Sequence, residues 1–205
     1  MLLASAAVVA KENPATVEEL LTKAMPNGDT VEAALQEKIL VIGENLKIRR
    51  FVRYEGPCVA YIHAGGTHGV LVNFEVSDEV FAKPEFEAYG KDIAMQIAAA
   101  NPSYLNKEEV PAEVLEKEKE ILTQQAINEG KPAAIAEKMV AGRIAKYYKE
   151  NCLVEQAFIK DDSVKVADLL KKGNVTIANC VFYVMGEGLE KKTDDFAAEV
   201  DNMVK

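Results

Sequence analysis

The residues of this sequence best suited to chemistry are its two histidines, His63 and His68, which lie around a glycine-rich turn. Gly65 and Gly66 supply that turn, because glycine adopts positive φ without strain. Runs of β-forming residues flank it, and this pattern predicts a β-hairpin over 59–76. Imidazoles at a hairpin tip are well placed to contact a partner, and equally well placed to face water without any function.

Metal and nucleophile chemistry has little support in the sequence. The three cysteines, Cys58, Cys152 and Cys180, lie far apart and form no C-x-x-C pair, which disfavours a structural zinc site. Their sparse, odd number suits a reducing compartment. No phosphate-binding glycine loop or nucleophile elbow occurs. We therefore expect no enzyme, catalytic residue, cofactor or metal. An unrecognised enzyme would need His63, Cys58 and a carboxylate around one cavity.

Composition indicates a globular chain with one large or two small domains. It has 205 residues, of which 49% are hydrophobic, and a net charge of −9. This negative charge disfavours nucleic acid or an anionic membrane as the main partner. Residues 1–10 are apolar but lack a basic flank, and Lys11 and Glu12 end the run too early for a membrane span. We expect a helix there.

Hydrophobic periodicity and breakers predict the remaining elements. Helices are expected over 2–12, 17–25, 30–42, 85–100, 166–172 and 187–204. A strand with one basic face is expected over 46–55, a loop over 77–84 and an extended segment over 153–159. A further strand over 175–184 would complete a three-stranded sheet with the hairpin.

The most helical stretch, 109–148, is interrupted by Gly130 and Pro132. Glycine ends a helix and proline suits the first turn of the next one, so the stretch predicts an antiparallel helical hairpin. Its apolar spacing fits a short coiled coil and fits equally well two ordinary helices lying on the core.

Two parts of the chain are alike. Residues 6–14 and 94–102 are similar helical segments at one constant offset, and they end at Asn13-Pro14 and Asn101-Pro102. This similarity indicates a duplicated half-domain. Convergent use of Asn-Pro as a helix stop is the alternative.

Several segments together resemble one family. IGENLKIRR over 42–50 resembles the I-G-E-N-x-x-[IV]-R-R motif of elongation factor Ts, and HAGGTHGVLV over 63–72 is similar to that family's hairpin. DIAMQIAA over 92–99 is similar to its D-I-A-M-x-I-A-A helix. Further similar segments lie within 116–143 and 186–200, so the likeness runs in order from about residue 4 to 204.

The resemblance implies a fold and a function. The fold would be α+β, with duplicated half-domains of antiparallel three-stranded sheet and helices, an inserted antiparallel coiled-coil hairpin and a C-terminal helix. The function would be guanine-nucleotide exchange: binding the GTPase elongation factor Tu in its GDP form and speeding GDP release by disturbing its Mg²⁺ site and phosphate-binding loop. A cytoplasmic location, no cofactor, no direct nucleic-acid or membrane partner, and an additional capacity to form a homodimer are also implied.

The resemblance also assigns residues and domains. Ile42, His63, Asp195 and Phe196 would contact elongation factor Tu. Residues 1–55 would be the remainder of the first half-domain, 56–108 and 151–186 the second, 109–150 the coiled-coil insertion and 187–205 the C-terminal module.

The family usually begins with a small three-helix domain, and it carries a T-D-F-V loop near the partner's Mg²⁺ site. Neither is found, so we expect an N-terminally incomplete member, in which the first half-domain is truncated. Such a chain would bind the GTPase but exchange nucleotide poorly. The competing interpretation is a helical-hairpin interaction module without exchange activity, which would not bind purified elongation factor Tu.

Overall fold

A computed structural model of the protein describes residues 2–130 and 132–188. It combines helices with antiparallel sheets, as expected for the α+β class. The chain divides into two compact units, Met1–Gly56 and Pro57–Lys205. Each unit has its own hydrophobic core, so each is described by itself.

The first unit contains three helices, α1 (Leu2–Glu12), α2 (Val17–Thr22) and α3 (Val31–Ile42). Thr16 and Thr30 cap the last two, because their hydroxyl oxygens accept hydrogen bonds from backbone N–H groups in the first turn, at 3.2 and 3.1 Å. The buried core is Val8, Val9, Leu20, Met25, Val31 and Ala34. These helices match the predicted ones, although α2 ends earlier than expected.

The strand predicted over 46–55 is wrong. After α3 the described chain runs to Gly56 with neither helix nor strand. Ile48 and Phe51 instead pack on the core of the first unit, and Arg53 Nε donates to the carbonyl oxygen of Ala10 at 3.3 Å. A strand needs a neighbour for its backbone hydrogen bonds. An alternating pattern cannot show whether that neighbour is present.

A three-stranded antiparallel sheet organises the second unit, in the order β1-β2-β5. Its strands are β1 (Cys58–His63), β2 (His68–Glu75) and β5 (Thr176–Val184). The turn between β1 and β2 is the short helix η1 (Ala64–Gly66), in which Gly65 and Gly66 have φ of 67° and 99°. The predicted hairpin and its completion by the third strand are therefore confirmed.

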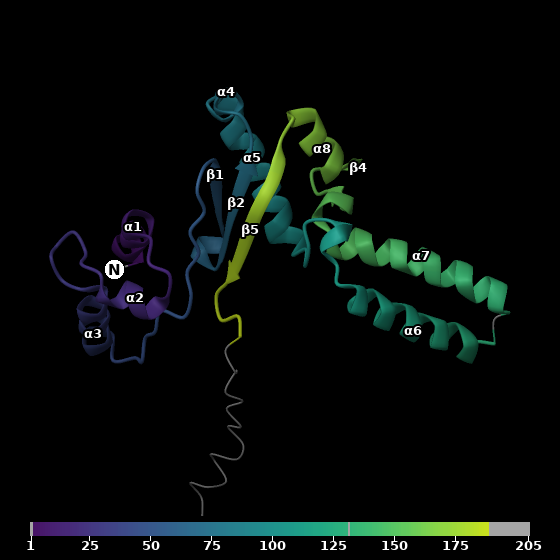
Figure 1. Ribbon diagram of the computed structural model, residues 1–205, viewed down its shortest axis with the longest axis horizontal. Helices are drawn as coiled ribbons and strands as arrows, with labels where there is room; N and C mark the ends of the chain where they lie inside the picture. Colours follow the sequence, from purple (N-terminus) through teal and green to yellow (C-terminus); the bar gives the residue numbers. More distant parts are fainter. Residues whose placement is uncertain (1, 131, 189–205) are drawn as a thin grey trace, which may run out of the picture. The chain divides into compact units, whose positions relative to one another are not determined.

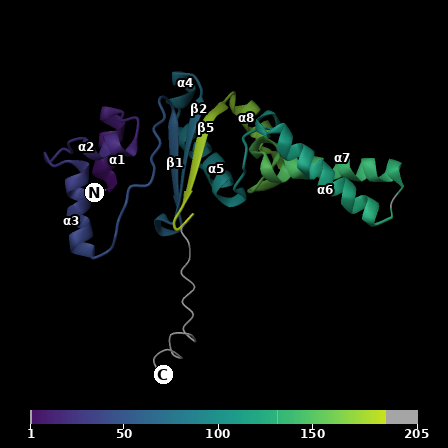
Figure 2. The same ribbon diagram turned by 60° about the horizontal axis from the view of Figure 1, so that its bottom comes forward.

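One face of this sheet packs on α5 (Pro84–Ala100), which lies along β1 and β2 in both views (Figures 1 and 2). A short helix, α4 (Asp78–Phe81), precedes it where a loop was expected, and Ser77 caps α4. The helix α8 (Val166–Gly173) completes the core. The largest fully buried apolar side chains of this core are Val72, Phe74, Ile93, Ile97, Leu153 and Val166.

Gly90 allows α5 to approach the sheet closely. A Cβ atom at this position would lie 2.6 Å from Cγ2 of Val59. We expect Gly90→Ala to lower the free energy of unfolding by about 1–3 kcal/mol through overpacking. The matched control is Gly142→Ala, in the helix α7 (Ala133–Asn151), where an added Cβ would meet nothing within 4 Å. There alanine should stabilise by about 0.5–1 kcal/mol. Urea denaturation measures both changes, and the same sign for the two would contradict this account.

Two long helices, α6 (Ala112–Asn128) and α7 (Ala133–Asn151), run side by side away from the sheet and form the predicted helical hairpin (Figures 1 and 2). Ala126 and Ile144 are buried on it. Short elements flank its base. They are η2 (Lys107–Glu109), η3 (Leu153–Glu155), β3 (Ala157–Phe158) and β4 (Asp161–Lys165). The segment expected to be extended over 153–159 is therefore a 3₁₀ turn followed by the two-residue strand β3, and β4 was not predicted.

Candidate functional site

The last turn of α3 carries three adjacent apolar side chains that are exposed. Leu40, Val41 and Ile42 are 83%, 73% and 55% exposed, whereas Val31, Ala34 and Leu35 on the same helix are buried. Gly43 then ends the helix in the left-handed region, and its N–H donates to the carbonyl oxygen of Ile39 at 2.8 Å. Adjacent exposed apolar side chains of this size are typical of a binding surface. Only Ile42 was singled out from the sequence, although three large apolar residues in a row cannot share one buried helix face.

His63 ends β1 at the tip of the hairpin, and its side chain is exposed. The hydroxyl of Tyr61 lies 2.9 Å from its Nδ1 atom, and the two rings stack at 5.8 Å. His68 is its direct cross-strand partner. The structure thus brings both histidines together at the end of the hairpin. This pairing follows from the antiparallel register, and the turn signal alone did not specify that register.

Asp195 and Phe196 lie outside the described residues, as does the helix predicted over 187–204 except for Glu187 and Gly188. Those two residues belong to a turn after β5. The structure therefore gives these candidates no position relative to Ile42 or His63.

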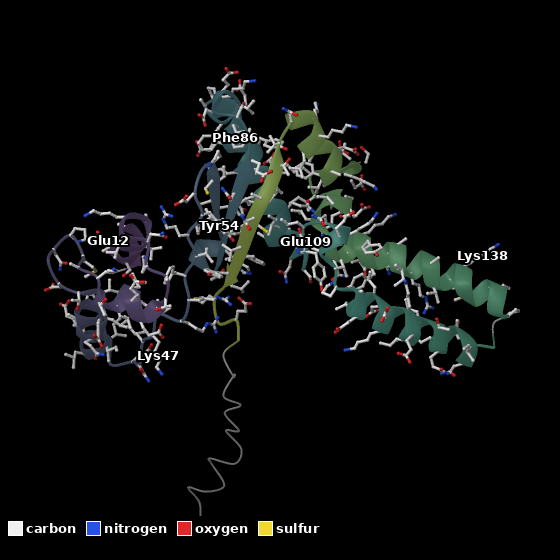
Figure 3. The ribbon with its side chains drawn as sticks, viewed as in Figure 1. Glu12, Lys47, Tyr54, Phe86, Glu109 and Lys138 are labelled. Carbon is white, nitrogen blue, oxygen red and sulfur yellow. The ribbon has the colours of Figure 1, made fainter. Side chains whose placement is uncertain are left out.

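The helical hairpin presents another surface. Arg143 Nη1 donates to Gln125 Oε1 at 2.8 Å across the two helices. Ile121, Ile127 and Ile135 are each about half exposed or more. Lys138 lies near the start of α7, close to the outer end of the hairpin where the two helices are joined, while Glu109 lies near the base (Figure 3). The hairpin is thus a projecting arm with apolar side chains on its outside.

The base of this arm, which we call the root, is held by segments 103–105 and 151–154. The backbone N–H groups of Ser103 and Tyr104 donate to the carbonyl oxygen of Asn151 at 2.9 and 3.0 Å. Those of Leu153 and Val154 return bonds of 3.0 and 3.1 Å to the first segment. These four bonds fix where the arm leaves the core.

Two ion pairs to Glu155 lie beside the root. Lys107 Nζ lies 2.9 Å from a carboxylate oxygen of Glu155, and Lys165 Nζ lies 3.5 Å from the other. The hydrogen bond from Lys107 lowers the pKa of Glu155, and the same bond raises the pKa of Lys107.

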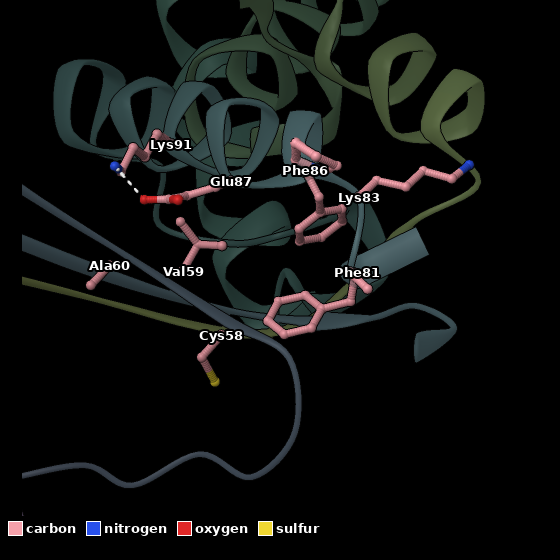
Figure 4. Close-up of a pocket in the computed structure, with 10 residues that line it drawn as sticks. Cys58, Val59, Ala60, Phe81, Lys83, Phe86, Glu87 and Lys91 are labelled. Carbon is pink, nitrogen blue, oxygen red and sulfur yellow. Dashed lines mark hydrogen bonds and ion pairs between the residues drawn. The ribbon is translucent and has the colours of Figure 1, made fainter. Parts of the chain in front are cut away.

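A cavity of about 610 Å³ lies between the start of β1 and the α4–α5 corner. Figure 4 shows the rings of Phe81 and Phe86 at one side of it, Cys58 at another, and the ion pair of Glu87 with Lys91 (2.6 Å) above Val59. His63 does not line this cavity. It lies at the opposite end of β1, about 16 Å along an extended strand. The arrangement expected of an enzyme, with His63, Cys58 and a carboxylate around one cavity, is therefore not formed here.

Residues 2–130 and 132–188 carry neither a metal-binding cluster nor a membrane-spanning helix. No group of three or more His, Cys, Asp or Glu side chains there is arranged to hold a metal ion. Among the helices described, none has both the length and the apolar character needed to cross a bilayer.

Comparison with known protein families gives a match over most of the chain. A family model described as "Elongation factor TS" matches residues 2–187. The match includes α3 with its exposed end, the sheet that carries His63, and the arm.

Proposed function

The chain belongs to the elongation factor Ts family, and from this premise we propose that it binds elongation factor Tu in its GDP form and promotes GDP release during translation elongation. The single observation that carries this proposal is the family match over residues 2–187. No bond is made or broken by such a factor, and it works in the cytoplasm without a cofactor.

The mechanism is differential binding. A factor that binds the nucleotide-free GTPase more tightly than the GDP form must weaken GDP binding by the same coupling free energy. A coupling of about 1–3 kcal/mol weakens GDP by about 5- to 150-fold. The contacts should therefore be apolar and aromatic anchors on exposed surfaces.

We assign two described anchors to this interface. Ile42 offers a half-exposed apolar side chain beside Leu40 and Val41 at the end of a capped helix. His63 offers an imidazole whose Nδ1 is held by the Tyr61 hydroxyl, so its ring is oriented before binding. Asp195 and Phe196 complete the proposed interface on the basis of the family resemblance alone.

We also propose that the fold is a duplicated half-domain with an inserted coiled coil. The two alike segments end in the same way: Asn13 and Asn101 have φ of 47° and 44°, and each donates its N–H to the carbonyl four residues earlier. Residues 1–55 are then the first half-domain, 56–108 with 151–186 the second, 109–150 the coiled coil and 187–205 a C-terminal module.

The test measures release of fluorescent GDP from elongation factor Tu. We expect the chain to accelerate release in a concentration-dependent way, and Ile42→Ala or His63→Ala to reduce its apparent affinity for elongation factor Tu by about tenfold each, as truncated interface anchors do. Ile159→Ala is the matched control for Ile42→Ala, because Ile159 is exposed to a similar extent, 44% against 55%, but is not assigned to the interface.

Two results would contradict the proposal. Absence of any complex with GDP-bound or nucleotide-free elongation factor Tu would rule out the partner. A stable complex with unchanged GDP release would rule out the exchange activity while leaving elongation factor Tu as the partner.

A further inference from the structure

Two imidazoles face each other across adjacent strands at the hairpin tip. His63 and His68 are direct partners in the antiparallel register of β1 and β2. Their ring centroids lie 6.2 Å apart at an interplanar angle of 74°. The backbone of the two strands fixes this pairing, so the imidazoles stay close whether or not they share a ligand.

Each imidazole is also oriented by its own neighbours. The Tyr61 hydroxyl lies 2.9 Å from Nδ1 of His63, and the Thr67 hydroxyl lies 2.7 Å from Nδ1 of His68. His63 stacks on Tyr61 at 5.8 Å, and His68 stacks on Phe182 at 5.8 Å. When Nδ1 carries the proton and donates to the hydroxyl, Nε2 presents a lone pair. Fixing the second nitrogen in this way is how proteins prepare histidine to bind a metal.

We propose that His63 and His68 form a two-imidazole site for a divalent transition-metal ion of the Ni²⁺, Cu²⁺ or Zn²⁺ class. These ions prefer imidazole nitrogen, whereas Mg²⁺ and Ca²⁺ prefer oxygen. Two imidazoles that share one ion at about 2.1 Å have centroids about 5 Å apart for near-tetrahedral angles. The observed 6.2 Å requires a small rotation of the exposed His63 ring.

An ion bound here would exchange with solvent, and the fold would not depend on it. Within the described residues no third His, Cys, Asp or Glu joins the pair, so water completes the coordination. Six register pairs hold β1 to β2 without an ion, from Cys58 with Asn73 to His63 with His68. Ion binding should therefore leave the fold unchanged and should compete with any other use of His63.

The test is calorimetric titration of Ni²⁺ into the full untagged chain at pH 7.5. We expect one ion per chain. His63→Gln and His68→Gln should each weaken binding at least tenfold, and the double variant should not bind at this site. Tyr61→Phe keeps the ring stack but removes the hydroxyl, and it should weaken binding by about 10-fold, as loss of a supporting hydrogen bond does.

A thiol control and a second measurement complete the test. Cys58→Ser should bind as tightly as the original chain, since Cys58 lies at the other end of β1. With Zn²⁺, the Nε2 nitrogen resonances of both histidines should shift together. The proposal is overturned if the double variant binds as the original chain does, or if Cys58→Ser abolishes binding. Neither measurement includes elongation factor Tu, so this proposal and the proposed function can fail separately.

Discussion

Replacing Phe74 by alanine is expected to lower the free energy of unfolding of the second unit by about 3–5 kcal/mol. Phe74 lies on β2, is only 2% exposed and packs edge-to-face on Phe86 with centroids 5.3 Å apart. Its loss leaves a cavity between the sheet and α5 that neighbouring side chains fill only in part. Urea denaturation followed by circular dichroism measures the change.

Phe81 provides a closely matched control. It contacts the same ring of Phe86 at the same centroid distance of 5.3 Å, also edge-to-face, but it is 39% exposed. Phe81→Ala should therefore cost only about 1 kcal/mol, the scale of an aromatic pair. Equal losses for the two variants would show that the contact with Phe86, and not burial, sets the cost.

The second large effect is expected at Gln96, which is buried at 1% exposure on α5. Its Nε2 donates to Gln156 Oε1 at 3.1 Å and to the carbonyl oxygen of Ala157 at 3.2 Å. Its Oε1 accepts from the N–H of Ile159 at 2.8 Å. Gln96→Leu keeps the volume but leaves these groups without their partner. Each unsatisfied buried group costs about 1–3 kcal/mol, so we expect a loss of about 3 kcal/mol or more.

Gln125→Leu is the control for this substitution. Gln125 also accepts a hydrogen bond, from Arg143 at 2.8 Å, but it is exposed, so water replaces the lost partner. Its cost should stay within about 1 kcal/mol. Hydrogen exchange gives an independent check: the Ile159 amide should exchange faster in Gln96→Leu and at the original rate in Gln125→Leu. Unchanged exchange at Ile159 would show that the bond to Gln96 does not protect it.

The sequence predicted the elements whose signals are local. The hairpin followed from Gly65 and Gly66 between β-forming runs, and α3 followed from its cap at Thr30 and its stop at Gly43. Elements that depend on distant partners were not predictable. Segment 46–55 alternates without forming a strand, whereas β4 is a polar strand that forms because β3 pairs with it. Gln96 within an apolar helix gave no sign that residues far along the chain satisfy it.

The sequence predicted only some of the residues and features of the candidate site. The family resemblance supplied Ile42, His63, Asp195 and Phe196, and the structure shows that the first two have exposed side chains. Their role at an interface remains a prediction for the exchange experiment. The exposure of Leu40 and Val41 and the cross-strand pairing of the two histidines required the folded backbone, because helix ends and strand register are tertiary properties.

Because of how the root is held, the length of the arm can change independently of the sheet core. Its four backbone hydrogen bonds join segment 103–105, which precedes α6, to segment 151–154, which begins at the last residue of α7. The entry and exit points are thus fixed independently of how far the helices extend. Insertions or deletions of one heptad in each helix keep the apolar faces in phase. The arm can therefore change its reach by about 10 Å per heptad while the sheet core keeps its sequence.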